Sequence, residues 1–224
     1  MKLPSYVCGS WHEGTGSCVQ LFGAVDGSAV CEVNRDGIDF AAVVRHGREV
    51  GGAALRAMTF HERAAALKAM AKYLMSKKED FYAVSAKTGA SRSDGWVDIE
   101  GGIGTVFSYA SLVNREFPND TVMVEGDMER LSAKGSFVGR HILTSKPGVA
   151  VHINAFNFPC WGMLEKIAPS LAAGMPVIVK PATPSAYLTE AMVREMVGGG
   201  FLPQGAIQPV SYTHLTLPTT LSSW

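Results

Sequence analysis

The pattern of apolar and polar residues predicts a helical region in the first half of the chain. Its clearest helix has apolar residues three or four positions apart, which share one face: Phe60, Ala64, Leu67, Ala71 and Leu74. Thr59 and Glu62 at its start have the spacing of a capping box. We expect further helices over 39–55, over 78–87 and from about residue 94 onward, so that the region spans 39–117.

A glycine-rich stretch, GGIG at residues 101–104, lies inside the last of these helices. A phosphate-binding loop needs a strand before its glycines and a helix that begins within them, and this context offers neither. Glycines inside a helix instead allow a neighbouring helix to pack closely. We therefore interpret the stretch as a packing site.

Short apolar runs broken by glycine predict strands in two other regions. YVCGSW at 6–11 and SAVCEV at 28–33 have the composition of strands near the start of the chain. The second region, about residues 130–147, has the pattern of a hairpin or an extended excursion.

From residue 148 the pattern alternates between strand and helix. GVAVHINAF at 148–156 and MPVIVKPA at 175–182 are continuous apolar runs, typical of strands buried in a parallel sheet. The alternation predicts an α/β fold with a Rossmann-type parallel sheet over 148–208. A third strand is due near Ile207, but no strand pattern follows it, so we expect the sheet to be incomplete.

Proline and glycine mark the helices of this second region. Pro159 is placed to begin the first helix and Gly174 to end it. Thr183 and Pro184 have the pattern of a cap and a first helical position, and Gly198 ends the helix that they begin.

Composition narrows the classes of function. The 224 residues include 20 Lys and Arg and 20 Asp and Glu, so the net charge is zero and nothing favours a nucleic acid or a membrane as partner. With 47% apolar and 18% charged residues, and no apolar run long enough to cross a bilayer, we expect a soluble cytoplasmic protein. The four cysteines have no metal-ligand spacing, so we expect free thiols and no metal site: Cys8, Cys18, Cys31 and Cys160.

Both predicted strands of the sheet end at a polar side chain. Asn157 follows the first strand and Lys180 stands near the end of the second. In open α/β sheets, ligands bind beyond the carboxyl ends of the strands. An amide and an ammonium in that position could hold a nucleotide and a reacting carbonyl group, although many α/β proteins meet this condition.

The residues around these strand ends are more specific. The segment 156–186, FNFPCWGMLEKIAPSLAAGMPVIVKPATPSA, closely resembles the aldehyde dehydrogenase superfamily, whose members carry a W/F-N-F-P motif followed at this distance by K-P-A/S. YVCGSW resembles the opening strand of that family, and TFHERAAALKAMAKYL at 59–74 resembles its early helix. The resemblance covers about residues 3–208 and implies NAD(P)-dependent oxidation of an aldehyde.

The resemblance also implies a role for each strand end. Asn157 matches an asparagine whose amide stabilises the oxyanion formed when a cysteine thiolate attacks the aldehyde; the alternative is an amide that ties two loops together. Lys180 matches a lysine that contacts the adenosine ribose or its phosphate; the alternative is a solvated lysine. The cofactor-binding residues that the resemblance implies are Ile153, Phe156, Asn157, Lys180, Thr183 and Ser185.

Thr183 bears on the choice between the two cofactors. In the family, an acid three residues after the lysine binds both ribose hydroxyls and favours NAD, whereas this chain has Thr183 there and Ser185 nearby. A hydroxyl can donate to a 2′-phosphate that a carboxylate would repel. We therefore expect NADP, with NAD as the alternative.

Cys160 stands at a helix start just after Asn157, where a thiolate would be stabilised. The resemblance argues against a nucleophile here, because the family's cysteine lies much further along the chain and this position is usually apolar. We therefore expect a small buried side chain.

Within the family, the resemblance is to members of phenylacetate degradation that also carry an oxepin-CoA hydrolase domain. It implies a CoA-linked semialdehyde as substrate and a homo-oligomer for the full-length protein. The cysteine nucleophile, the glutamate base and any hydrolase domain are expected beyond residue 208, so the 224-residue chain is expected to be inactive. The rival hypothesis is a non-catalytic module that binds a nucleotide or joins an oligomer, since the family segment matching 130–147 takes part in oligomer contacts.

Residues 209–224 depart from the family pattern and contain no Asp, Glu, Lys or Arg. The stretch from Val210 to Thr219 matches the translation of a transposase-end adapter used in DNA sequencing. We therefore expect 209–224 to be foreign sequence, with the family domain ending at residue 208.

Overall fold

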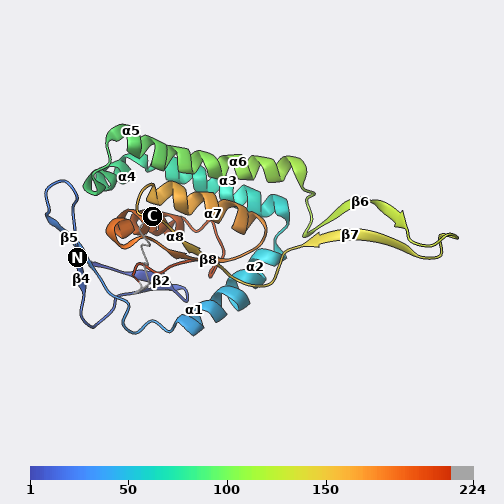
Figure 1. Ribbon diagram of the computed structural model, residues 1–224, viewed down its shortest axis with the longest axis horizontal. Coiled ribbons are helices and arrows are strands. Elements are labelled where there is room, and N and C mark those ends of the chain that lie inside the picture. Colours follow the sequence, from blue (N-terminus) through green and yellow to red (C-terminus); the bar gives the residue numbers. More distant parts are fainter. Residues whose placement is uncertain (213–224) are drawn as a thin grey trace, which may run out of the picture.

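A parallel sheet of three short strands lies near the centre of the computed structural model, which describes residues 1–212 (Figure 1). The strands are β8 (Ala150–Ile153), β9 (Val177–Lys180) and β10 (Ile207–Pro209), in the order β10-β9-β8. Helix α7 (Pro159–Ala172) connects β8 to β9, and helix α8 (Ala186–Gly198) connects β9 to β10. The predicted alternation and the Rossmann-type parallel sheet are confirmed.

The third strand corrects the prediction that the sheet would lack it. Gln208 of β10 is held on both sides, because its amide donates to the Val43 carbonyl at 2.9 Å and accepts from the Cys8 amide at 2.9 Å. A strand of three residues is too short for periodicity to reveal it. Its parallel pairing with β9 defines the strand, and the bonds of Gln208 anchor it to the N-terminal part of the chain.

The packed part of the chain continues past β10. The Val210 amide donates to the Val179 carbonyl at 2.8 Å, and the Ser211 hydroxyl donates to the Pro4 carbonyl at 2.6 Å. Residues 209–211 of the segment predicted as foreign therefore pack with the fold, while 213–224 lie outside the described residues. The origin of 209–224 stays a prediction, which sequencing of the coding DNA across codons 208–210 would test.

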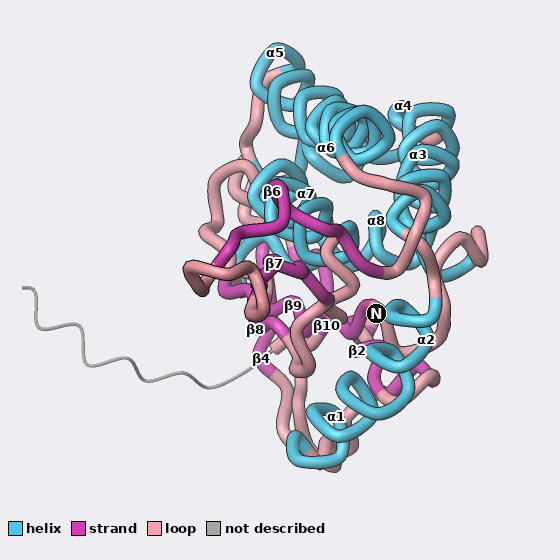
Figure 2. Tube along the Cα trace, turned by 90° about the vertical axis from the view of Figure 1, so that its right-hand side faces the viewer, coloured by secondary structure: helices cyan, strands magenta, loops and turns pink. Residues whose placement is uncertain are grey.

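Helices cover both faces of the sheet (Figure 2). Val177 and Val179 of β9 point into the main core with residues of α7 and α8. Ile178, between them, lies on the opposite face against Val43 of helix α1 (Phe40–His46) and Val210. Because both faces are covered, β9 has a continuous apolar sequence instead of an alternating one.

The predicted helical region is confirmed. Its elements in chain order are α1, the π-helical turn η1 (Gly47–Gly51), α2 (Gly52–Ala57), α3 (Phe60–Ser76), α4 (Lys78–Ser85), the 3₁₀ turn η2 (Ala86–Thr88), α5 (Arg92–Gly95), the π-helical turn η3 (Trp96–Gly101) and α6 (Gly102–Glu116). α3 and α6 pack against each other and against α7. The predicted apolar face of α3 is buried: Phe60, Ala64, Leu67, Ala71 and Leu74. None of the helices within residues 1–212 is long and apolar enough to cross a membrane.

The capping box at the start of α3 is confirmed and makes a testable contribution. The Thr59 hydroxyl accepts from the Glu62 amide at 3.1 Å, and the Glu62 carboxylate accepts from the Thr59 amide at 2.7 Å. Thr59→Ala removes the acceptor, so we expect the free energy of unfolding to fall by about 1 kcal/mol in urea titration. Thr59→Ser keeps the acceptor and is expected to stay near the wild-type value, and equal losses in both variants would contradict this role.

The prediction of one strand over 6–11 is wrong. Residues there form a hairpin of β2 (Ser5–Val7) and β3 (Ser10–His12), with a turn at Cys8 and Gly9. Both turn residues have positive φ, 51° and 79°, and the glycine adopts this conformation without a steric penalty. A separate sheet near the N-terminus has the order β1-β5-β4, with β1 (Lys2–Leu3), β4 (Val19–Phe22) and β5 (Ala29–Val33).

The predicted excursion is an antiparallel hairpin that projects from the body of the molecule (Figure 1). It consists of β6 (Val122–Arg130) and β7 (Val138–Thr144), so it begins earlier than the predicted residue 130. Large apolar side chains on it are exposed: Val124, Met128, Leu131, Phe137, Val138, Ile142 and Leu143.

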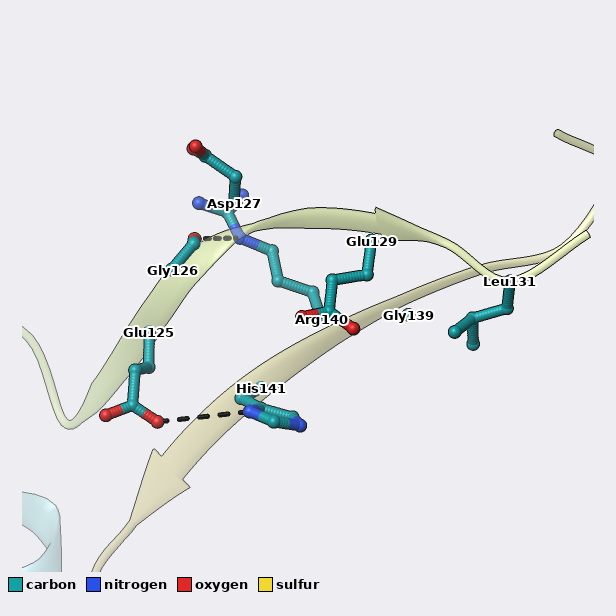
Figure 3. Close-up of a pocket in the computed structure, with 8 residues that line it drawn as sticks. All are labelled: Glu125, Gly126, Asp127, Glu129, Leu131, Gly139, Arg140 and His141. Carbon is teal, nitrogen blue, oxygen red and sulfur yellow. Dashed lines mark hydrogen bonds and ion pairs between the residues drawn. The ribbon is translucent and has the colours of Figure 1, made fainter.

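Polar side chains line a shallow hollow of about 280 Å³ on this hairpin (Figure 3). Arg140 donates from Nε to the Gly126 carbonyl at 3.3 Å, and His141 lies 4.0 Å from the Glu125 carboxylate. Both members of the latter pair are more than half exposed, so their interaction stabilises the fold little. The site residues implied by the sequence lie elsewhere, at the ends of β8 and β9.

Candidate functional site

The carboxyl ends of β8 and β9 lie side by side. Ile153 stands opposite Lys180 in the register, and the Asn154 amide donates to the Lys180 carbonyl at 3.0 Å. Two of the expected site residues, Ile153 and Lys180, are therefore neighbours. Val151 and Ile153 are 58% and 56% exposed, because β8 is the edge strand within the described residues. The expectation that the whole of 148–156 would be buried is wrong for these two side chains, and also for Ala155 and Phe156 after the strand.

Asn157 lies in the turn between β8 and α7. It is exposed, as is Phe156, and its amide makes no hydrogen bond within residues 1–212. The next residue, Phe158, has φ 53° and ψ 54°, a left-handed conformation that costs about 1–2 kcal/mol for a residue with a Cβ. Pro159 is the first residue of α7, as predicted. The turn thus presents a free amide to solvent in a strained backbone.

Two hollows meet at Asn157. The first, of about 270 Å³, is lined by Ser85, Thr88, Gly89, Ala90, Asp94, Asp98, Phe156, Asn157, Phe158 and Pro159. The second, of about 420 Å³, is lined by Val97, Ala155, Asn157, Phe158, Trp161, Gly162, Glu165 and Lys166. The exposed amide therefore has room beside it for a small molecule on either side of the turn.

A buried carboxylate holds the first turn of α7. Asp98 of η3 is 4% exposed, and its Oδ1 accepts from the Trp161 amide at 2.7 Å. Burial raises the pKa of the Asp98 carboxyl, although hydrogen bonds from Trp161 and Cys160 act in the opposite direction. No motif in the sequence marks Asp98 as a site residue; it stands out only as an acid within an apolar helix face.

Cys160 is fully buried, as expected. Burial raises the pKa of its thiol well above the ordinary value, and the neighbouring Asp98 carboxylate acts in the same direction. A thiol that resists ionisation and cannot be reached by solvent is unsuited to be a nucleophile.

Gly101 and Gly102 act as a packing site at this point, as the sequence predicted, whereas a Cβ on Gly104 would meet nothing within 4 Å. A Cβ on Gly101 would lie 2.6 Å from the Trp161 ring, and a Cβ on Gly102 would lie 2.8 Å from the Trp161 Cα. Only glycine lets the start of α6 approach α7 so closely.

The end of β9 carries the other expected site residues. Lys180 is half-buried, its Nζ donates to the Pro181 carbonyl at 2.6 Å, and burial lowers its pKa. Thr183 and Ser185 bound a 3₁₀ turn, η4 (Thr183–Ser185), and α8 begins only at Ala186. The prediction that Thr183 caps an α-helix is therefore wrong, because the residues after it take the tighter 3₁₀ geometry and no side chain caps the turn.

The donors at this strand end suit a ribose or a phosphate. Lys180 supplies a cation, the half-buried Thr183 supplies a hydroxyl, and the buried Ser185 hydroxyl has no hydrogen-bond partner within residues 1–212. Within those residues no hydrogen bond or ion pair joins Asn157 to any of the three. The expected site residues thus form two groups: the Asn157 side chain after β8, and the donors of Lys180, Thr183 and Ser185 at the end of β9.

Asn154 is a further polar residue at this edge, and it lies outside the set that the sequence predicted. It is 6% exposed, and neither its Oδ1 nor its Nδ2 has a hydrogen-bond partner within residues 1–212. A buried amide without partners is costly. Its position at the end of an apolar run was visible in the sequence.

Known proteins share both the sequence and the fold. The profile of the aldehyde dehydrogenase family matches residues 11–221. The chain is 45% identical to 3,4-dehydroadipyl-CoA semialdehyde dehydrogenase of Aromatoleum evansii, over 94% of this chain and 41% of that protein. It is 30% identical to 2-aminomuconic 6-semialdehyde dehydrogenase of a Pseudomonas species, over 92% of this chain and 41% of that protein.

Solved structures match the fold over nearly the whole chain. An NADP-dependent enzyme of E. coli superposes with a TM-score of 0.78 at 21% identity, over 93% of this chain and 42% of that one. An NAD-dependent benzaldehyde dehydrogenase of Corynebacterium glutamicum gives a TM-score of 0.78 at 23% identity, over 93% of this chain and 44% of that one. The chain thus spans about two fifths of the length of the relatives and structures that it matches.

Proposed function

Because the chain belongs to the aldehyde dehydrogenase family, we propose that it is the N-terminal part of an NAD(P)-dependent enzyme that oxidises a CoA-linked semialdehyde to the acid. The observation that carries this proposal is the exposed Asn157 amide, presented by a strained turn beside two hollows. The substrate class is supported by the 45% identity to a CoA-semialdehyde dehydrogenase.

In this proposal Asn157 stabilises the oxyanion that forms when a thiolate adds to the aldehyde carbon. Its amide N–H donates to the oxygen as negative charge develops there, and a donor fixed before the reaction needs no reorganisation. The free amide supports this role, since no other group within residues 1–212 occupies its hydrogen bonds. Cys160 is buried, so we propose that the nucleophile, like the glutamate base, belongs to the part of the full-length protein beyond residue 208.

The cofactor would be held at the end of β9. Lys180 and Thr183 offer a cation and a hydroxyl to the ribose or its 2′-phosphate, while Ile153 flanks them on β8. Phe156, Asn157 and Ser185 complete the proposed set of contacts. When bound, the nicotinamide accepts the hydride. We propose NADP as the preferred form, with NAD as the alternative.

Thr183 offers a direct test of this preference. Thr183→Glu in the full-length protein places a carboxylate where a 2′-phosphate would sit, and the carboxylate can bind ribose hydroxyls instead. We expect the ratio of the Kd values for NADP and NAD to shift toward NAD by about tenfold or more in calorimetric titration, since a charged hydrogen bond contributes about 1.5–3 kcal/mol. Thr183→Ser keeps a hydroxyl and should retain the wild-type ratio. An unchanged ratio in Thr183→Glu would place the 2′-phosphate elsewhere.

The proposed activity is tested with the full-length protein that carries this chain. We expect the turnover of a CoA-linked semialdehyde to exceed that of the same semialdehyde without CoA. The reverse order would indicate an enzyme for free aldehydes.

We also propose that the protein serves phenylacetate or related aromatic-acid breakdown and carries an oxepin-CoA hydrolase domain. Hydrolase activity of the same polypeptide tests the presence of that domain.

One observation favours the rival function. The hairpin β6–β7 projects from the body and exposes apolar side chains, as a segment that contacts another subunit would. The 224-residue chain alone, which we propose to be inactive, could then act as an oligomer partner or a nucleotide-binding module. Soluble expression with saturable NADP binding would support that function, and aggregation would oppose it. For the full-length enzyme we propose a homo-oligomer.

A further inference from the structure

We infer that Asp98 is a positioning residue: its carboxylate fixes the first turn of α7 and thereby the strained turn that presents Asn157. The inference rests on the proposed role of Asn157 and adds a residue that lies outside the sequence motif, although it is one of those that line the first hollow. Its starting point is the 2.7 Å hydrogen bond from the Trp161 amide to Asp98 Oδ1, which joins η3 to the start of α7.

Helix α7 lacks a cap of its own. The first amides of any helix have no partner within the helix, and a side chain of the preceding residue usually accepts from one of them. Here that residue is Phe158, which has no side-chain acceptor. Asp98, from a different part of the chain, supplies the acceptor instead. Its negative charge also lies at the positive end of the α7 dipole.

The backbone that Asp98 holds is strained. Phe158 has φ 53° and ψ 54°, and a left-handed conformation in a residue with a Cβ persists only when the surroundings impose it. On one side Phe158 is joined to Asn157, and on the other to the turn that Asp98 binds. If the carboxylate is removed, Phe158 can relax, and the adjacent Asn157 amide changes direction.

Asp98 is buried against α7. It is 4% exposed and lies in η3, and its Oδ1 reaches the Trp161 amide from there. The close approach of Gly101 and Gly102 to Trp161 keeps η3 and α6 against this helix. Asp98 forms no ion pair within residues 1–212, and its partners are the first turn of α7, namely the amides of Trp161 and Cys160 and the Cys160 thiol.

Another acid of the same turn provides a matched control. Glu100 stands two residues later, and its carboxylate accepts from Lys78 at 3.0 Å and from Tyr82 at 2.8 Å, away from α7. Glu100→Ala therefore removes an acid and its hydrogen bonds from η3 without touching the turn that holds Asn157.

A double-mutant cycle in the full-length enzyme separates positioning from a general effect on the fold. We expect Asp98→Ala to lower kcat by about tenfold or more, because a small misplacement of a catalytic group is costly, while the Kd for NADP stays within about twofold. Combined with Asn157→Ala, the same change should lower kcat by less than about twofold further, since the donor that Asp98 positions is already gone. Glu100→Ala should leave kcat near the wild-type value. Equal losses from Asp98→Ala with and without Asn157 would overturn the inference, as would an unchanged kcat.

Two further measurements keep the test decisive. If Asp98→Ala does not fold, Asp98→Val, which fills more of the space and also lacks an acceptor for the Trp161 amide, replaces it in the cycle with the same expected coupling. If Asn157→Ala leaves kcat unchanged, the proposed oxyanion role fails, and the inference is decided by a crystal structure of the Asp98 variant. A Phe158 that keeps its left-handed conformation there overturns the inference, and one that leaves it supports Asp98 as the holder of the turn.

Discussion

Replacing Asn157 with alanine in the full-length protein should lower kcat by about 10²–10³-fold, the loss typical of removing one oxyanion donor. The amide is exposed, unpaired within residues 1–212 and placed between two hollows. Its removal therefore takes a hydrogen-bond donor away from a bound aldehyde without breaking a hydrogen bond of the fold. Steady-state kinetics with a semialdehyde substrate would measure the effect. The melting temperature should stay near the wild-type value.

Binding of NADP provides the control for this variant. Lys180 and Thr183 hold the proposed ribose site on a different strand end, so the Kd for NADP should change by less than about twofold, well under the 1.4 kcal/mol that a tenfold change requires. A kcat that stays at the wild-type value would falsify the oxyanion role and favour the alternative, an amide that ties two loops together. A loss of NADP binding together with kcat would instead mean that Asn157 acts mainly by holding the cofactor.

Replacing Arg63 with methionine should destabilise the protein by about 3 kcal/mol or more, because several buried carbonyls lose their donor. Arg63 is 1% exposed and forms no ion pair within residues 1–212. Its guanidinium donates to the Ala172 carbonyl at 2.8 Å, the Leu55 carbonyl at 2.9 Å and the Met58 carbonyl at 2.7 Å. It therefore joins the ends of α2 and α7 to α3.

Urea unfolding of this variant would measure the loss, with Lys72→Met as the matched control. Lys72 is exposed on the same helix, and its replacement also exchanges a cationic side chain for methionine. Because no buried group loses a partner there, the free energy of unfolding should change by less than about 0.5 kcal/mol. A loss below about 1 kcal/mol in Arg63→Met would mean that water or rearranged groups satisfy the carbonyls. The prediction would then be wrong.

The sequence was most informative where a local rule decides the structure. The face of α3, its capping box and the first residue of α7 were all predicted, because periodicity, a side-chain cap and a proline each act within a few residues. The motif around Asn157 and Lys180 also identified the family, which the match over residues 11–221 establishes.

The errors occurred where contacts between distant residues decide. β10 was missed because three residues carry no period, while Gln208 forms its bonds with Val43 and Cys8 far back in the chain. Ile153 was expected to be buried, but its exposure depends on which strand borders β8. One further error was local: the hairpin over 5–12 was predicted as one strand over 6–11 because its turn consists of only two residues.

By itself, then, the sequence determined the family, the alternating α/β pattern and the two polar residues at the strand ends, because these depend on motifs and on local periodicity. Only the tertiary structure showed that Asn157 lies free between two hollows and that Phe158 beside it is strained. It alone brought Asp98, about 60 residues earlier, to the start of α7. A hydrogen bond between helices depends on how they pack, and that packing follows from the burial of many side chains at once instead of from any short stretch of sequence.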